Sequence, residues 1–182
     1  MELKALKGLA VAGIAGCLAA GAAWAAYPEK NMQYIIPFTP GGESDYVARM
    51  QAEIFRKKHD HSMVVQNRPG AGGGLVWAQL NSLPADGHTI VGINLPHVVL
   101  QPLEGNVQYK TEDLTPVYFY HFTADAIVVP QSSPFKTYQD LVAAAKAKPG
   151  SLNFAGSGSF SANHMAHERL NKLAGNKTTY VP

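Results

Sequence analysis

The sequence predicts an α/β fold in which helices pack against parallel sheets in two successive lobes. Short apolar runs alternate with helix-length amphipathic segments along residues 27–93, and the alternation restarts after residue 134. The stretch between them is irregular, so we expect a first lobe at residues 26–124 and a second at residues 125–182. Hydrophobic residues make up 46% of the chain and charged residues 15%, a composition that excludes intrinsic disorder.

The first 25 residues have the pattern of a cleaved signal peptide. Lys4 and Lys7 precede an uncharged run, residues 8–26, that contains the small-x-small signal Ala23-Trp24-Ala25. The only cysteine, Cys17, follows Ile14-Ala15-Gly16 and could instead be the acylated cysteine of a lipoprotein. Because the run stays apolar after Cys17, we expect cleavage rather than anchoring. The mature chain would then have no thiol for disulfides, catalysis or metal binding.

The first lobe is expected to begin with a strand, a helix and a second strand. Residues 34–38 form a short apolar run that is typical of a buried strand, and Pro40-Gly41-Gly42 ends it. From Ser44, apolar residues recur at helical spacing up to the basic residues 56–58, which suit the end of a helix. Residues 63–66 are the second predicted strand.

A glycine-rich loop at residues 67–74 leads into a helix through Ala78 and Leu80, followed by a strand at residues 88–93. We expect residues 95–111 to be a loop with little structure of its own. It contains three residues that interrupt helices: Pro96, Pro102 and Gly105.

The second lobe follows two apolar runs, residues 116–122 and 126–130. Thr137 can cap a helix that Pro149-Gly150 ends. The remaining predicted elements are a strand at 151–155, a Gly/Ser turn at 156–160, a helix at 161–173 and a strand at 178–181.

Two strand-to-helix turns share a design that suits anion binding, one at residues 38–45 and one at residues 156–161. Glycine lets a ligand approach the backbone, the first N–H groups of a helix lack intrahelical partners, and the helix dipole adds positive charge. The alternative is that both are ordinary turns with serine caps. Asp45 would repel a bound anion unless it points away, holds a backbone amide or pairs with an amino group of the ligand.

Motifs for nucleotide binding and serine hydrolysis are absent. A G-x-G-x-x-G motif from Gly70 or Gly156 would need glycine where Leu75 and Ser161 stand, and no P-loop lysine or G-x-S-x-G is present. The formal net charge of +2 does not suit a nucleic-acid binder. We therefore expect neither a cofactor nor a nucleic-acid partner.

Histidines offer weaker candidates. His164 and His167 lie three residues apart but fit no zinc motif and suggest no third ligand, so we expect no metal. His164, in the first turn of its helix, is either a donor to a ligand or a packing residue. His97, in the loop after the strand at 88–93, has the same two interpretations with less support.

Taken together, these residues resemble the substrate-binding receptors of tripartite tricarboxylate transporters, also called Bug receptors. Matching stretches occur in the same order along almost the whole mature chain. They are Tyr27-Pro28-Glu29-Lys30, Pro37-Phe38-x-Pro40-Gly41-Gly42-x-Ser44-Asp45-x-x-Ala48-Arg49, Asn67-Arg68-Pro69-Gly70-Ala71-Gly72-Gly73, Asp86-Gly87-x-Thr89, Leu114-Thr115-Pro116-Val117, Ser133-Pro134-Phe135-Lys136-Thr137, Lys148-Pro149-Gly150-Ser151-Leu152-Asn153-Phe154, and Ser157-Gly158 with His164 behind it.

The resemblance implies a two-lobed fold like that of type II periplasmic binding proteins, α/β in both lobes, closing on a small carboxylate between them. It implies a non-enzymatic periplasmic receptor, expected to be monomeric, that delivers an organic acid to integral membrane permease subunits. Carried over by position, the ligand-binding residues are Phe38, Thr39, Gly41, Gly42, Ser44, Asp45, Asn94, His97, Ser157, Gly158, Ser159, Ser161 and His164.

The sequence departs from the family pattern at three places. Val76-Trp77 stand where the family often has Gly-Ala, and Phe160 where glycine is common. The family also continues past Pro182, so we expect an incomplete second lobe in a C-terminally truncated member. Two alternatives stay open: a small hydrolase that pairs Ser157 or Ser159 with His164, and a receptor fragment without binding function.

Overall fold

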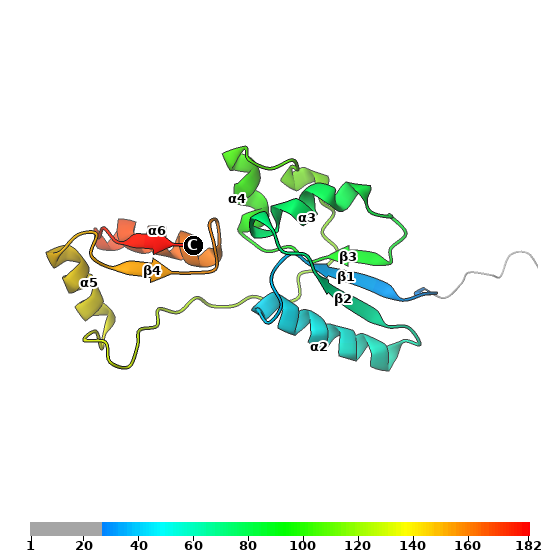
Figure 1. Ribbon diagram of the computed structural model, residues 1–182, viewed down its shortest axis with the longest axis horizontal. Coiled ribbons are helices and arrows are strands. Elements are labelled where there is room, and N and C mark those ends of the chain that lie inside the picture. The colour runs from blue at the N-terminus through cyan, green and yellow to red at the C-terminus, as the bar shows by residue number, and fades with distance from the viewer. Residues whose placement is uncertain (1–26) are drawn as a thin grey trace, which may run out of the picture.

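The structure is a computed structural model that describes residues 27–182. The predicted signal peptide and Cys17 lie outside the described residues. Two parallel sheets, each with its own helices, lie on either side of an extended segment, residues 114–130 (Figure 1). The α/β class expected from the alternating pattern is confirmed.

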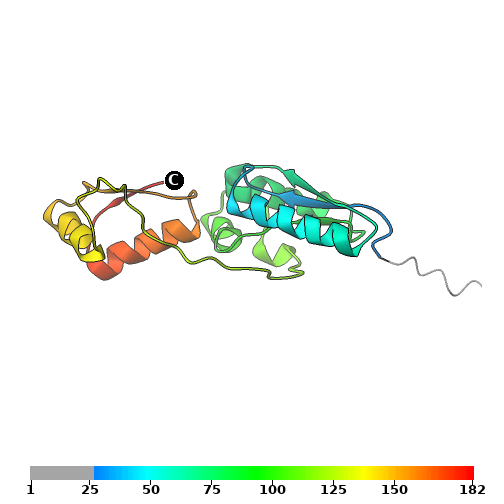
Figure 2. The same cartoon turned by 90° about the horizontal axis from the view of Figure 1, so that it is seen from below.

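The first sheet has three parallel strands in the order β2-β1-β3. Helices cover both of its faces, with α2 on one side and α3 on the other (Figures 1 and 2). Tyr34 and Ile36 of the central strand pack with Ala48 of α2, whereas Trp77 of α3 belongs to a separate cluster. The elements are β1 (Met32–Ile36), α2 (Glu43–Lys58), β2 (Met63–Asn67), α3 (Gly74–Gln79) and β3 (Thr89–Val91).

The predicted loop at residues 95–111 is wrong, because helix α4 (His97–Glu104) forms there. Pro102 lacks the N–H that would bond to the carbonyl of Val98 in a regular helix. That carbonyl instead accepts a hydrogen bond from Thr111 Oγ1 at 2.8 Å. The helix therefore tolerates the proline, since the acceptor that the proline leaves free has another donor.

The second sheet pairs two short parallel strands, and two helices accompany it. Thr137 caps the first helix as predicted, in a reciprocal capping box with Asp140. The elements are α5 (Tyr138–Ala147), β4 (Asn153–Ala155), α6 (Ala162–Ala174) and β5 (Thr179–Val181). Single 3-10 turns occur at Ala71–Gly73, Leu80–Ser82 and Thr111–Asp113.

The segment 114–130 between the sheets is extended and forms no strand. Two polar groups hold it: Glu43 of α2 contacts His121, at 3.0 Å, and Thr123, whereas Asn163 of α6 contacts Asp125. The predicted lobe boundary near residue 124 falls within this segment. Leu114 at its start is buried in the core cluster that contains Trp77, whereas seven of its other large apolar side chains are exposed, namely Val117, Tyr118, Phe119, Phe122, Ile127, Val128 and Val129.

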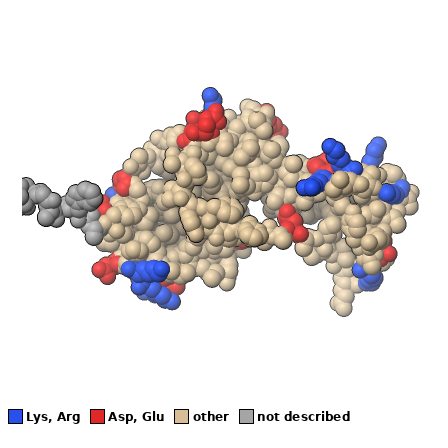
Figure 3. Space-filling model, turned by 180° about the vertical axis from the view of Figure 1, so that it is seen from behind, with Lys and Arg blue, Asp and Glu red and all other residues tan. Residues whose placement is uncertain are grey.

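We call the first sheet with helices α2, α3 and α4 the first body, and the second sheet with helices α5 and α6 the second body. Acidic and basic side chains are interspersed on the face shown in Figure 3, where a gap separates the two bodies beside the segment that joins them. Among residues 27–182, no helix is long and apolar enough to cross a membrane.

Candidate functional site

The first predicted turn joins β1 to α2 and is organised by Asp45. The Asp45 side chain is buried, and its Oδ2 accepts hydrogen bonds from the Gly41 N–H at 2.9 Å and from Arg49 Nε at 3.1 Å. Gly41 has φ +84°, in the left-handed region that favours glycine. Of the roles considered for Asp45, holding a backbone amide is the one the structure shows.

A polar network extends from this carboxylate to the end of β2. The Arg49 guanidinium lies 2.8 Å from Asp45 Oδ1 and also donates to Asn67 Oδ1 at 3.1 Å. Asn67 in turn donates to the Phe38 carbonyl at 3.1 Å. The Arg49 hydrogen bond, followed by that from the Gly41 N–H, lowers the pKa of Asp45 to about 2. Asp45 is therefore ionised at neutral pH, with its charge balanced by Arg49.

These pKa shifts predict that the chain loses stability in acid. The pKa values of Asp45 and of Asp86, which pairs with Lys30 at 2.7 Å, both fall from 3.8 to about 2. A carboxyl with a lowered pKa stabilises the fold when ionised, and that contribution disappears as the pH falls from about 5 toward 2.

We expect Asp45→Asn to be less stable than the unmodified chain at pH 7, with the difference shrinking toward pH 2. Denaturant titrations at several pH values, followed by circular dichroism, measure this. The exposed Asp60→Asn is the control. A difference that stays constant with pH would show that ionised Asp45 contributes nothing.

A second wall of the site comes from the loop after β3 and the start of α4. Asn94 Nδ2 donates to Ser44 Oγ at 3.3 Å, and the rings of His97 and Phe38 meet edge to face with centroids 5.8 Å apart. His97 is buried, and burial lowers its pKa, so its imidazole is neutral at neutral pH.

Neither ring nitrogen of His97 has a hydrogen-bond partner among the residues that the structure describes. The candidate residues of the first body come from the turn after β1 and from the loop after β3. They therefore gather beyond the carboxyl ends of these two strands, where ligands bind in open α/β sheets. Thr39 and Gly42 lie exposed in the same turn.

The second turn joins β4 to α6, and three of its predicted residues make internal contacts. Ser157 donates from its backbone N–H and its hydroxyl to Asn163 Oδ1, at 3.2 and 2.6 Å. Ser161 is the N-cap of α6 and accepts from the His164 N–H at 3.1 Å. Gly158 supplies a carbonyl to the Tyr180 hydroxyl at 3.0 Å, and Ser159 is exposed.

His164 is held by the turn. Its Nδ1 accepts from the Phe160 N–H at 3.1 Å, and its ring stacks on Tyr180 with centroids 4.4 Å apart. Phe160 has φ +61°, which is costly for a side chain of this size and is a conformation that glycine adopts without strain. The hydrolase alternative pairs Ser157 or Ser159 with His164. The Ser157 hydroxyl donates to Asn163 instead, and no hydrogen bond joins the Ser159 side chain to His164 within residues 27–182.

Five residues of these networks were not predicted as site residues from the sequence: Arg49, Asn67, Asp125, Asn163 and Tyr180. For Asn163 a local signal existed, since a polar residue in the first turn of a helix can fold back onto the preceding loop. Asp125 and Tyr180 come from distant parts of the chain, and no local pattern connects them with the turn.

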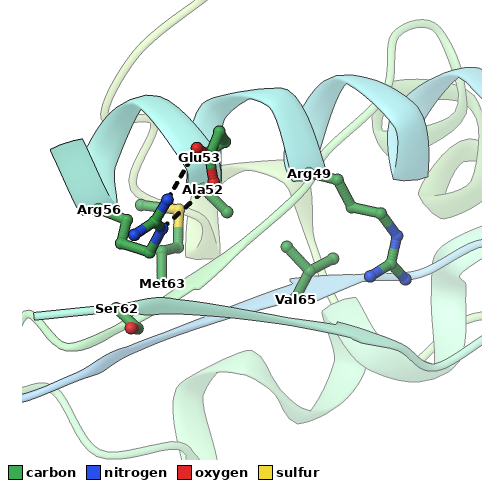
Figure 4. Close-up of a pocket in the computed structure, with 7 residues that line it drawn as sticks. All are labelled: Arg49, Ala52, Glu53, Arg56, Ser62, Met63 and Val65. Carbon is green, nitrogen blue, oxygen red and sulfur yellow. Dashed lines mark hydrogen bonds and ion pairs between the residues drawn. The ribbon is translucent and has the colours of Figure 1, made fainter.

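None of the candidate ligand-binding residues lines either of two shallow pockets of about 310 Å³ each, although Arg49, the partner of Asp45, lines one of them. One is between α2 and β2, where Arg56 turns onto Glu53 at 2.9 Å (Figure 4). The other surrounds the first described residues and the end of α2. The turn before α6, in contrast, faces the first body in both ribbon views (Figures 1 and 2).

Comparison with known proteins gives a consistent result. The family model described as "Tripartite tricarboxylate transporter family receptor" matches residues 47–182. The chain is 32% identical over 157 residues to a UPF0065 protein in the gbd 5' region of Cupriavidus necator, covering 86% of this chain and 48% of that protein. It is 32% identical over 177 residues to BugT of Bordetella pertussis, covering 96% of this chain and 53% of BugT.

Solved structures agree with this assignment. A protein solved as a periplasmic transporter superposes with a TM-score of 0.78 at 27% identity, covering 86% of this chain and 53% of that one. Rpa4515 of R. palustris, solved with adipate, gives 0.69 at 25% identity, with 86% and 53% coverage. MatC of Rhodopseudomonas palustris, solved with malate, gives 0.68 at 25% identity, with 86% and 54% coverage.

The chain spans about half the length of the curated relatives that it matches. Its two sheets form part of the two-lobed α/β fold of periplasmic binding proteins. The match over residues 47–182 and the agreement in fold show that the chain belongs to the receptor family of tripartite tricarboxylate transporters.

Proposed function

We propose that the protein is a periplasmic solute-binding receptor that captures a small carboxylate between its lobes and delivers it to the permease subunits of a tripartite tricarboxylate transporter. The observation that supports this most directly is the pair of strand-to-helix turns. They come from two different sheets in a chain whose family includes proteins solved with adipate and malate. We further propose that the signal peptide is cleaved after Ala25 and that the receptor is a non-enzymatic monomer.

The first turn suits a carboxylate although it contains an acidic residue. Arg49 balances the charge of Asp45, so an approaching anion meets a neutral pair rather than an isolated carboxylate. The N-terminus of α2 adds partial positive charge, and Asn94 and the neutral His97 add uncharged polar groups from the neighbouring loop. Capture by such groups needs closure of the lobes and no catalytic residue.

Calorimetry on the purified mature chain, residues 26–182, tests the proposal with a panel of malate, succinate, adipate and citrate. We expect saturable binding of at least one acid. Ser157→Leu should weaken it at least about tenfold, because the larger side chain occupies the space above the second turn.

Ser132→Leu is the matched control, since it makes the same change at an exposed position outside both turns. Its affinity should equal that of the unmodified chain. No binding heat with any acid of the panel would count against receptor function, and equal losses in both leucine variants would count against the second turn as part of the site.

A further inference from the structure

A chain of three polar side chains connects the extended segment to the second turn. Asp125 of the segment accepts a hydrogen bond from Asn163 Nδ2. Asn163 Oδ1 accepts two more, from the Ser157 backbone N–H at 3.2 Å and from the Ser157 hydroxyl at 2.6 Å. Ser157 itself is exposed, next to Gly158 at the tip of the turn.

The donor and the acceptor of each hydrogen bond between Asp125, Asn163 and Ser157 follow from the chemistry of the groups. A carboxylate can only accept, so Asn163 must turn its NH₂ group toward Asp125. Its carbonyl oxygen then faces Ser157, as the backbone N–H of Ser157 also requires. Because that oxygen can only accept, the Ser157 hydroxyl must give it its single proton.

The fixed hydroxyl of Ser157 determines what the second turn presents to a ligand. With its proton committed to Asn163, Ser157 Oγ offers only lone pairs, so it can accept from a ligand but not donate to one. The backbone N–H groups of Gly158 and Ser159 have no acceptor among residues 27–182 and remain free for a carboxylate. Because Ser157 directly precedes these two amides in the turn, its Oγ is the side-chain acceptor nearest in sequence to a carboxylate bound there.

We infer that Asp125 and Asn163 are positioning residues that make the second turn selective for carboxylates with an adjacent hydrogen-bond donor, a hydroxyl or ammonium group. This inference rests on the proposed receptor function. A serine without these partners would rotate and donate to any carboxylate oxygen, and would not discriminate between acids. The hydrogen bonds from Ser157 to Asn163 and from Asn163 to Asp125 prevent this rotation.

Malate and succinate provide the test, because they share a carbon skeleton and differ by one hydroxyl. We expect the unmodified chain to bind malate roughly fivefold more tightly than succinate by calorimetry, the effect of one hydrogen bond. Asn163→Ala should bring this ratio close to one, because the Ser157 hydroxyl becomes free to donate.

The exchanged pair, Asp125→Asn with Asn163→Asp, is the matched variant, since the new amide at residue 125 can donate to the new carboxylate at residue 163, which still accepts both Ser157 hydrogen bonds. It should keep the preference for malate even if the moved charge weakens both acids, because the ratio cancels that effect. An unchanged ratio in Asn163→Ala, or a ratio lost equally in both variants, would overturn the inference.

Amide hydrogen exchange measured by NMR decides the role of Asn163 without any ligand. The Ser157 amide should exchange roughly fivefold or more faster in Asn163→Ala than in the exchanged pair Asp125→Asn with Asn163→Asp or in the unmodified chain. Equal rates would overturn the inference. If neither acid binds while exchange still accelerates in Asn163→Ala, the proposed function fails for these acids and the positioning role stands.

Discussion

Replacing Trp77 with alanine is expected to lower the free energy of unfolding by about 3–5 kcal/mol. The indole is 1% exposed and lies in the core cluster of the first body with Val98, Tyr109 and Leu114. Its ring meets Tyr109 edge to face with centroids 5.8 Å apart. Alanine would leave a cavity between α3, α4 and β3 that the surrounding backbone cannot close.

Trp77→Phe separates packing from hydrogen bonding. Trp77 Nε1 donates to the buried Gly92 carbonyl at 2.9 Å, and phenylalanine would leave that acceptor unpaired at a cost of about 1–3 kcal/mol. We therefore expect a smaller loss than in Trp77→Ala.

Denaturant unfolding followed by circular dichroism measures the free energy of unfolding of these variants. Leu103 is 79% exposed, so Leu103→Ala is the control, and its free energy of unfolding should lie within about 0.5 kcal/mol of that of the unmodified chain. A loss in Trp77→Phe as large as in Trp77→Ala would mean that the hydrogen bond, not the packing, dominates. Phe38, a candidate site residue, packs against Trp77, so Trp77 also supports the first turn.

The elements that local patterns specify were predicted well, and those that depend on distant partners were not. Helix α2 was predicted from Ser44 to the basic residues 56–58 and spans Glu43–Lys58, because apolar spacing and end residues lie within it. Helix α4 was missed because a side chain 13 residues away, Thr111, satisfies the carbonyl that Pro102 leaves free. No helix pattern includes such a contact.

The candidate site divides in the same way. The sequence predicted both turns, and the structure brings Ser44 and Asn94 together from positions 50 residues apart. What could not be predicted is how the polar groups are shared: Asp45 takes the Gly41 amide, and Asn163 takes both donors of Ser157. Donor and acceptor assignment depends on three-dimensional geometry, which residue type and spacing leave open.

Tyr180 is the clearest case of a distant residue that shapes a turn, and Gly156→Ala is the change that tests it. A methyl group at Gly156 would lie 2.8 Å from Cε2 and Cζ of the Tyr180 ring and closer still to its hydroxyl. Since real side chains do not approach so closely, the ring must move. It would then lose its hydrogen bonds to the Gly158 carbonyl and to Ser161, and its stacking on His164.

We expect Gly156→Ala to lower the stability of the second body by about 2–4 kcal/mol, the sum of overpacking and lost hydrogen bonds. Local amide exchange in β4, β5 and α6 measures this, since the first sheet should be unaffected. Gly42→Ala in the other turn is the matched control. Its new methyl would meet only the Thr39 carbonyl at 3.7 Å, an ordinary contact, so its loss should not exceed about 1 kcal/mol.

A double-mutant cycle attributes the effect to Tyr180. In a Tyr180→Leu background the ring is absent, so adding Gly156→Ala should cost much less than it does in the unmodified chain, with a coupling energy of about 1–3 kcal/mol. If the two changes are additive, the clash with Tyr180 is not the cause of the instability. A large coupling would show that glycine is required at residue 156 because the tyrosine, 24 residues later in the chain, occupies the space above it and thereby fixes the turn that presents Ser157 and Gly158.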